Sequence, residues 1–197
     1  SENIIKVTGN PIVDIINENK QFFESGASYL DNEVMELSNN KFALVTCHRR
    51  ENILNKESFR EITSLLNSID DINVIFPIGY KTQAILKDSN TALNNNIKLI
   101  DPIGYLEFMY LLKKADYVAT DSGTVVEEAC ILNVPSIQMR YSTERPEVYD
   151  VKASVKFDPT ADDNNYGQVI DKVNSLKRGW KNPFGDGNSS QVIVNDL

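Results

Sequence analysis

Residues 115–128 combine residue types and a spacing suited to anion binding. An apolar run ends at Asp121, a Ser-Gly-Thr turn follows, and two adjacent glutamates lie near the start of an expected helix. The first N–H groups of a helix have no partner within it, and its N-terminus carries about half a positive charge, so this turn can bind a phosphate. Glu128 lies about one turn further along, where its carboxylate can accept hydrogen bonds from sugar hydroxyls. The pattern indicates a nucleotide or nucleotide-sugar ligand.

Helix capping explains part of this pattern without any ligand. Ser122 or Asp121 can serve as the N-cap, and Glu127 would suit the positive end of the helix. Capping does not explain Gly123, because glycine lowers helix stability unless the backbone needs an unusual φ or must approach a ligand closely. We expect Gly123 to serve one of these two purposes.

His48 is the single histidine of the chain and directly follows the apolar run 42–47. Its imidazole can be satisfied by backbone groups alone. At the carboxyl end of a central strand it would instead reach a ligand crevice, where the neighbouring Arg49 and Arg50 would suit a diphosphate. One histidine without clustered cysteines or carboxylates predicts no metal centre.

Two further groups leave alternatives open. Tyr105 and Phe108, three residues apart on an expected helix, can stack on a base or pack in the core. Arg145 precedes Pro146 in a polar stretch, where it can face a ligand or lie in solvent.

Short apolar runs alternate with helical patterns along the chain. The expected strands are 42–47, 73–78, 97–100, 117–120, 135–140 and 154–157. This alternation predicts an α/β fold, a Rossmann-like parallel sheet with helices on both faces. Ligands of such sheets bind beyond the carboxyl ends of the strands, and the polar clusters of this chain follow strands. They are residues 48–51, 101–102, 121–124 and 140–145.

Composition limits the classes of protein to which the chain can belong. With 197 residues and 41% hydrophobic content it can bury a sizeable core, and its net charge of −8 argues against binding to nucleic acid. No apolar run approaches the roughly 18 residues that a membrane span needs. Cys47 and Cys130 lie in apolar runs, which is typical of reduced core thiols in a cytoplasmic protein. We expect residues 1–40 to form a linker and a covering helix, and residues 41–197 to form one domain that includes a C-terminal helix.

Six ordered motifs resemble the non-hydrolysing UDP-N-acetylglucosamine 2-epimerases. They are residues 8–10, 45–52, 101–102 with 105–106 and 108, 120–128, 143–147 and 182–187. The resemblance covers the second half of this family, whose members consist of two Rossmann-like domains in a glycosyltransferase-B-like arrangement with the substrate between them. It implies that the chain is the nucleotide-binding half, that an N-terminal domain is its partner, and that the complete protein is a homodimer.

The resemblance also implies roles for individual residues. His48 would be catalytic and contact the diphosphate side of the substrate, and Glu128 would hold the ribose hydroxyls. The substrate-binding set implied by the family is Ile103, Phe108, Ser122, Gly123, Thr124, Glu128 and Arg145. Within it, Ser122, Gly123 and Thr124 would bind the phosphates. Phe108 and the backbone of Ile103 would flank the uracil, and Arg145 would complete the polar pocket.

The reaction of the family inverts the sugar at C2. A base removes the C2 proton, UDP leaves from C1, and UDP is then added back to the resulting glycal, without a metal or any other cofactor. The groups that transfer the proton belong to the N-terminal domain. The resemblance therefore implies that this chain alone binds UDP weakly and does not turn over.

Two other functions fit the same residues. The nucleotide-binding half of a glycosyltransferase-B-type glycosyltransferase would keep the ribose-binding glutamate, but it is not expected to carry both His-Arg-Arg-Glu at 48–51 and Glu-Arg-Pro-Glu at 144–147. A non-catalytic module that binds UDP-sugars is the second alternative.

Overall fold

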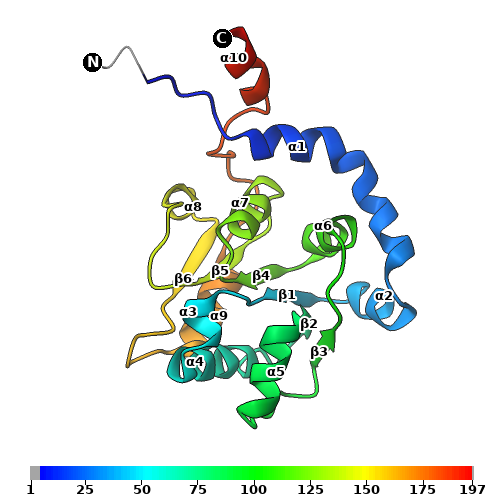
Figure 1. The fold of residues 1–197 in the computed structure, drawn as a ribbon, viewed down its shortest axis with the longest axis vertical. Coiled ribbons are helices and arrows are strands. Elements are labelled where there is room, and N and C mark those ends of the chain that lie inside the picture. The colour runs from blue at the N-terminus through cyan, green and yellow to red at the C-terminus, as the bar shows by residue number, and fades with distance from the viewer. Residues whose placement is uncertain (1–4, 197) are drawn as a thin grey trace.

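Six parallel strands form one sheet at the centre of the structure, a computed structural model that describes residues 5–196 (Figure 1). The strands are β1 (Phe42–Thr46), β2 (Asn73–Pro77), β3 (Ile97–Ile100), β4 (Tyr117–Thr120), β5 (Ser136–Met139) and β6 (Ser154–Phe157). Their order is β3-β2-β1-β4-β5-β6. Every predicted strand is present, and the Rossmann-like parallel sheet is confirmed.

The four inner strands β2, β1, β4 and β5 are buried on both faces of the sheet, which explains why their sequences are mainly apolar, whereas the edge strands β3 and β6 are partly exposed. In β1, Phe42 and Leu44 pack into the core on one face, whereas Ala43 and Val45 pack into the core on the other. This alternation is the two-residue period of an extended strand.

Helices cover both faces. They are α1 (Pro11–Asn19), the 3₁₀ helix η2 (Lys20–Tyr29), α2 (Asn32–Ser38), α3 (Arg50–Ile53), α4 (Lys56–Asn67), α5 (Tyr80–Asp88), α6 (Tyr105–Lys114), α7 (Gly123–Ile131), α8 (Glu147–Asp150), α9 (Tyr166–Ser175) and α10 (Ser189–Asn195). The core on one face contains side chains of α4, α5 and α9, and the core on the other contains side chains of η2, α6 and α7. Figure 1 shows α4 and α5 below the sheet and α6 and α7 above it.

The helical segment after β1 is divided into two helices. It divides into α3 and α4 because Asn55, in an extended conformation, caps α4. The Asn55 side-chain oxygen accepts from the N–H groups of Glu57 at 3.0 Å and Ser58 at 3.1 Å. The side chain of an N-cap satisfies donors that the helix cannot, so α4 begins anew at this point.

The N-terminal and C-terminal segments lie side by side. The N–H of Asn10 donates to Phe184 O at 2.8 Å. Asp14 of α1 accepts from the N–H groups of Ser189 at 3.1 Å and Ser190 at 2.6 Å, so it caps the start of α10. The first residues of the predicted linker, 1–4, and the last residue of the predicted domain, 197, lie outside the described part of the chain.

The sheet reverses its winding between β1 and β4. From β1 the chain proceeds to β2 and β3 on one side, and from β4 to β5 and β6 on the other. Ligands of open α/β sheets bind beyond the carboxyl ends of the strands at such a switch point. Here Thr46 and Thr120 end the paired strands in register, with their hydroxyl oxygens 2.6 Å apart.

Candidate functional site

A cavity of about 460 Å³ opens at the carboxyl ends of β1 to β4. It contains most of the residues predicted to bind a ligand. Those that line it are His48, Ile103, Phe108, Ser122, Thr124 and Glu128, together with Tyr105. Gly123 lies between two of these residues at the start of α7. The fold therefore brings together groups from four strand ends that are up to 80 residues apart in sequence.

The N-terminus of α7 borders this cavity. Ser122 is its N-cap and accepts from the N–H of Val125 at 3.4 Å, whereas the alternative cap, Asp121, bonds elsewhere. The N–H groups of the first helical residues, Gly123 and Thr124, have no partner within the helix. They are donors for an anion at the point where the helix dipole favours one.

The two explanations considered for Gly123 are an unusual φ and close approach of a ligand to the backbone. The backbone at Gly123 does not have a positive φ. Gly123 is the first residue of α7, and a Cβ on it would meet only Arg140 Nη1 within 4 Å, at 3.9 Å. The space beside Gly123 is therefore open. Of the two explanations, close approach of a ligand to the backbone is the one that fits.

Glu128 is 5% exposed and faces the cavity near Tyr105. Burial raises the pKa of its carboxyl to about 7, a hydrogen bond from Tyr105 opposes the rise, and the neighbouring charge of Glu127 adds to it. Burial and the nearby carboxylate likewise raise the pKa of Tyr105 to about 12. Glu128 therefore exchanges its proton near neutral pH, so a donor from a ligand can decide its charge.

Tyr105 does not lie in the core. It is 45% exposed at the start of α6, and its ring contacts Phe23 edge-on with the ring centroids 6.4 Å apart. The sequence suggested stacking or core packing for this side chain, and both of these use the aromatic ring. The contact with Glu128 uses the hydroxyl instead. That contact joins α6 to α7 across the cavity and cannot be found from spacing within one helix.

Glu127 points to a different part of the molecule. It is 4% exposed, and its Oε1 accepts from Asn10 Nδ2 at 2.7 Å and from Arg145 Nε. The prediction that Glu127 interacts with the helix dipole is wrong, because α7 begins at Gly123 and its first turn holds no acidic residue. Adjacent helical residues project about 100° apart, so the two glutamates serve different neighbours.

Arg145 lines a second hollow and is absent from the lining of the first cavity. This hollow, of about 1130 Å³, lies between residues 6–10, Glu127 and residues 181–186. The N–H of Arg145 donates to Thr143 Oγ1 at 3.0 Å, and its Nη1 donates to Glu144 O at 2.9 Å. The structure therefore separates Arg145 from the other predicted ligand-binding residues.

His48 follows β1 with its side chain 62% exposed. Its backbone N–H donates to both carboxylate oxygens of Asp121, at 3.0 and 3.2 Å, and its Nδ1 lies 3.5 Å from Asp121 Oδ1. From the sequence, Asp121 was expected to be a possible helix cap, and its contacts with the segment after β1 were not predicted. The missed signal is the pairing of β1 with β4, which puts the residues after Thr46 and Thr120 next to each other.

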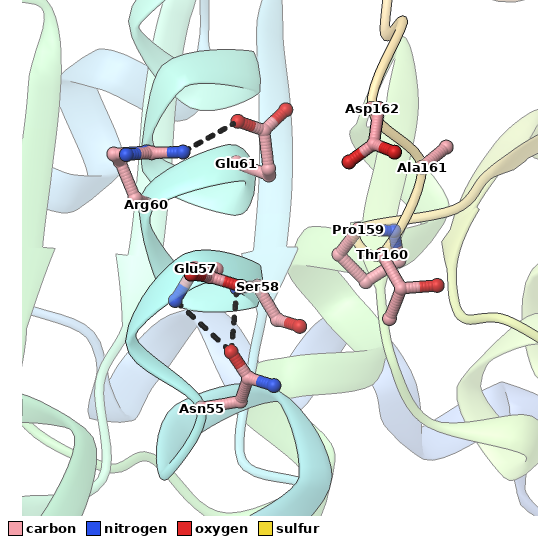
Figure 2. A pocket seen from close by; sticks show the side chains of 9 residues that line it. All are labelled: Asn55, Glu57, Ser58, Arg60, Glu61, Pro159, Thr160, Ala161 and Asp162. Atoms are coloured by element: carbon pink, nitrogen blue, oxygen red, sulfur yellow. Dashed lines mark hydrogen bonds and ion pairs between the residues drawn. The ribbon is translucent and has the colours of Figure 1, made fainter.

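A smaller hollow of about 270 Å³ lies between α4 and residues 159–162 (Figure 2). None of the predicted ligand-binding residues lines it. Its polar groups have structural partners: Asn55 caps α4, and Glu61 pairs with Arg60 at 3.7 Å and accepts from the Tyr166 hydroxyl at 2.7 Å. These contacts are structural and hold α4 against the segment after β6.

Both cysteines are buried free thiols, as predicted. Burial raises the pKa of Cys47 well above its usual range and that of Cys130 to about 11, so neither forms a reactive thiolate at neutral pH.

Across residues 5–196, no helix has both the length and the apolar composition to cross a membrane. The same residues contain no cluster of three or more histidine, cysteine or carboxylate side chains arranged to hold a metal.

Comparison with known sequences gives close matches over the whole chain. A family model described as UDP-N-acetylglucosamine 2-epimerase matches residues 1–197. The UDP-N-acetylglucosamine 2-epimerase of Methanococcus maripaludis is 40% identical and covers 99% of this chain, which matches 55% of that relative. The enzyme of the same name from Methanocaldococcus jannaschii is 39% identical, with 100% of this chain and 55% of the relative covered.

Solved structures agree with the sequence matches. A crystal structure of Methanocaldococcus jannaschii UDP-GlcNAc 2-epimerase in complex with UDP-GlcNAc and UDP has a TM-score of 0.83 at 38% identity and covers 100% of this chain and 55% of that one. A co-structure of S. aureus MnaA with UDP has a TM-score of 0.72 at 26% identity, covering 99% of this chain and 53% of that one. The chain spans about half the length of the curated relatives that it matches. It belongs to the UDP-N-acetylglucosamine 2-epimerase family.

Proposed function

We propose that this chain binds the UDP part of UDP-N-acetylglucosamine, or of a related UDP-HexNAc, as the nucleotide-binding half of a 2-epimerase. One observation carries the proposal. A single cavity holds a helix N-terminus for phosphate, a buried carboxylate for hydroxyl groups and an apolar wall for a base. These three features provide a partner for each of the phosphate, ribose and base parts of a nucleotide.

Each part of UDP has an assigned partner in this proposal. Ser122, Gly123 and Thr124 bind the phosphates at the start of α7, and Glu128 accepts from the ribose hydroxyls. A ribose hydroxyl that donates to Glu128 favours the charged form of this carboxyl. Burial disfavours that form in the free protein and raises the pKa of the carboxyl to about 7.

The base and the sugar lie at opposite ends of the proposed ligand. Ile103 and Phe108 flank the uracil, and His48 meets the diphosphate. Arg145 lines the second hollow, apart from the proposed UDP site, where Glu127 holds its guanidinium in the free protein. We place the sugar and the second domain on this side.

The chemistry proposed for the complete protein is loss of the C2 proton and elimination of UDP, followed by return of UDP to C1 as a proton is delivered to the opposite face of C2. The α7 N-terminus and His48 stabilise the departing diphosphate, where charge develops. The base that removes the C2 proton comes from a second domain outside these 197 residues, so the chain alone binds UDP and does not epimerise. No metal and no other cofactor takes part in this proposal.

The assembly and the compartment are part of the proposal. We propose that residues 1–40 link the two domains, that residues 41–197 form the UDP-binding domain, and that the complete protein is a homodimer. Buried free thiols support a reducing compartment, so we place the protein in the cytoplasm. Light scattering of the complete protein measures its oligomeric state.

Calorimetric titration of the chain with UDP tests nucleotide binding. We expect saturable binding of UDP, a weaker response to ADP, and loss of affinity in Glu128→Ala. Glu57→Gln, an exposed change on α4, is the matched control and should bind as the wild type does. No binding at millimolar UDP, or equal affinity in Glu128→Ala, would contradict the assignment.

Adding the second domain tests the reaction. With that domain present, proton NMR should show conversion of UDP-N-acetylglucosamine to its C2 epimer. UDP binding without epimerisation in the complete protein would favour a module that only binds UDP-sugars.

A further inference from the structure

Asp121 has a fully buried carboxylate at the carboxyl end of β4. Its Oδ2 accepts from the N–H of Arg49 at 2.9 Å, the N–H of His48 at 3.0 Å and Asn52 Nδ2 at 3.2 Å. These bonds fasten the segment after β1 to the segment before α7. They account for a polar group at this position, and a neutral asparagine oxygen would satisfy the same three donors.

A carboxylate differs from an asparagine in having a second acceptor oxygen, and that oxygen faces the imidazole. Asp121 Oδ1 lies 3.5 Å from His48 Nδ1 and also accepts from the His48 N–H at 3.2 Å. Burying a carboxylate is costly, so a position that retains one points to a partner that uses its charge. The partner that faces Oδ1 is the side chain at the mouth of the candidate site.

We propose that Asp121 is a positioning residue for His48. It holds the imidazole with Nδ1–H toward Oδ1, so that Nε2 faces the cavity, and it stabilises the charged imidazole when a diphosphate lies there. Carboxylate–histidine pairs fix the tautomer of the ring in this way. The part that concerns the diphosphate rests on the proposed function. The present 3.5 Å separation is long for a hydrogen bond, and contacts of this kind shorten when substrate binds.

The tautomer of His48 can be measured without any ligand. Because His48 is the single histidine, a long-range ¹H–¹⁵N spectrum of the chain contains one imidazole, with no assignment needed. In the neutral ring we expect the proton on Nδ1, although free histidine prefers it on Nε2. A wild-type ring protonated on Nε2 would overturn the proposal, and this measurement needs no variant.

Two substitutions separate the proposed role from a structural one. Asp121→Asn keeps one oxygen for the three donors and places an NH₂ group opposite Nδ1, so the ring proton should move to Nε2. The matched control, Asn52→Ala, removes one of the donors to Oδ2 and leaves Oδ1 unchanged, so the proton should stay on Nδ1. An unchanged tautomer in Asp121→Asn would refute the pairing.

Binding measurements test whether Asp121 acts through His48. Asp121→Asn should lower the affinity for UDP about tenfold, the loss expected from one charge-assisted hydrogen bond, and leave the affinity for uridine unchanged. In a His48→Ala background, Asp121→Asn should have no further effect. Equal losses for UDP and uridine, or a full loss without His48, would show a merely structural role and overturn the proposal. If the chain binds no UDP at all, the proposed function fails, while the tautomer still decides whether the pair exists.

Discussion

Replacing Glu128 with glutamine is expected to remove a pH-dependent loss of stability. Burial raises the pKa of this carboxyl to about 7 in the folded chain, against an ordinary value of 4.5. Below pH 4.5 the group is protonated in both the folded and the unfolded states. As the pH rises, the unfolded chain releases this proton first, so the free energy of unfolding falls until the folded carboxyl also ionises near pH 7.

The magnitude follows from the separation of the two pKa values. About 2.5 pH units at about 1.4 kcal/mol each amount to about 3 kcal/mol lost by the wild type between acid and mildly alkaline pH. Glutamine has nearly the same shape and no charge, so Glu128→Gln lacks this term. The free energy of unfolding of the variant should therefore increase by about 3 kcal/mol relative to that of the wild type as the pH rises from about 4 to about 8.

Urea unfolding measures this difference. Trp180 is the single tryptophan, and its indole N–H donates to Cys130 O at 2.9 Å, so its fluorescence reports the packing behind α7. The wild type, Glu128→Gln and the exposed control Glu57→Gln are compared at several pH values. The reasoning is refuted if the difference in the free energy of unfolding between the wild type and Glu128→Gln stays constant with pH. It is also refuted if the wild type becomes more stable relative to the variant as the pH rises.

The same carboxyl links pH to nucleotide affinity. Ribose hydroxyls donate to the charged form, so UDP binding should strengthen as the pH rises toward about 7 and then level off. Glu128→Gln should bind UDP about tenfold or more weakly, because a charge-assisted acceptor is lost, and should lack this dependence on Glu128. Titrations of both proteins across the pH range would contradict the ribose assignment if their affinities were equal.

Three further changes test neighbouring contacts. Tyr105→Phe removes the hydroxyl that hydrogen-bonds Glu128, so the pKa of that carboxyl should rise, and the midpoint of the stability loss should move to higher pH in urea unfolding. Gly123→Ala puts a methyl group into the open space beside α7; calorimetry should show weaker UDP binding, whereas the free energy of unfolding should stay equal or rise by up to about 1 kcal/mol. Glu127→Ala leaves Arg145 and Asn10 without their acceptor and should lower the free energy of unfolding by about 1–3 kcal/mol.

The strands could be predicted because they are short, mainly apolar runs, four of which the sheet buries on both faces. Ile97–Ile100, Tyr117–Thr120 and Ser154–Phe157 match their predicted bounds, and the other three strands differ by one residue at one or both ends. The division into α3 and α4 was missed because it depends on Asn55, whose capping role is visible only once its side chain contacts the next turn.

The site was less predictable because its contacts join distant parts of the chain. The sequence placed Asp121, Gly123 and Glu127 in one helix-start motif. In the fold, Asp121 accepts hydrogen bonds from the segment after β1, more than 70 residues earlier in the sequence. Glu127 accepts hydrogen bonds from Arg145 and Asn10. A pattern within one helix contains no information about these partners, because the pairing of β1 with β4 and the path of residues 140–147 determine them.

Three arginines in the segments that follow β1 and β5 pair with the protein's own carboxylates. Arg140 Nη1 lies 2.6 Å from Glu144 Oε2, and Arg49 Nη2 lies 3.8 Å from the other oxygen of Glu144. Arg145 is paired with Glu127. In a chain of net charge −8, these pairs leave little exposed positive potential to attract polyanions in general. The first N–H groups of α7, the phosphate donors in the proposed function, belong to no ion pair, so under that proposal an acidic protein binds one diphosphate at one place without breaking an ion pair.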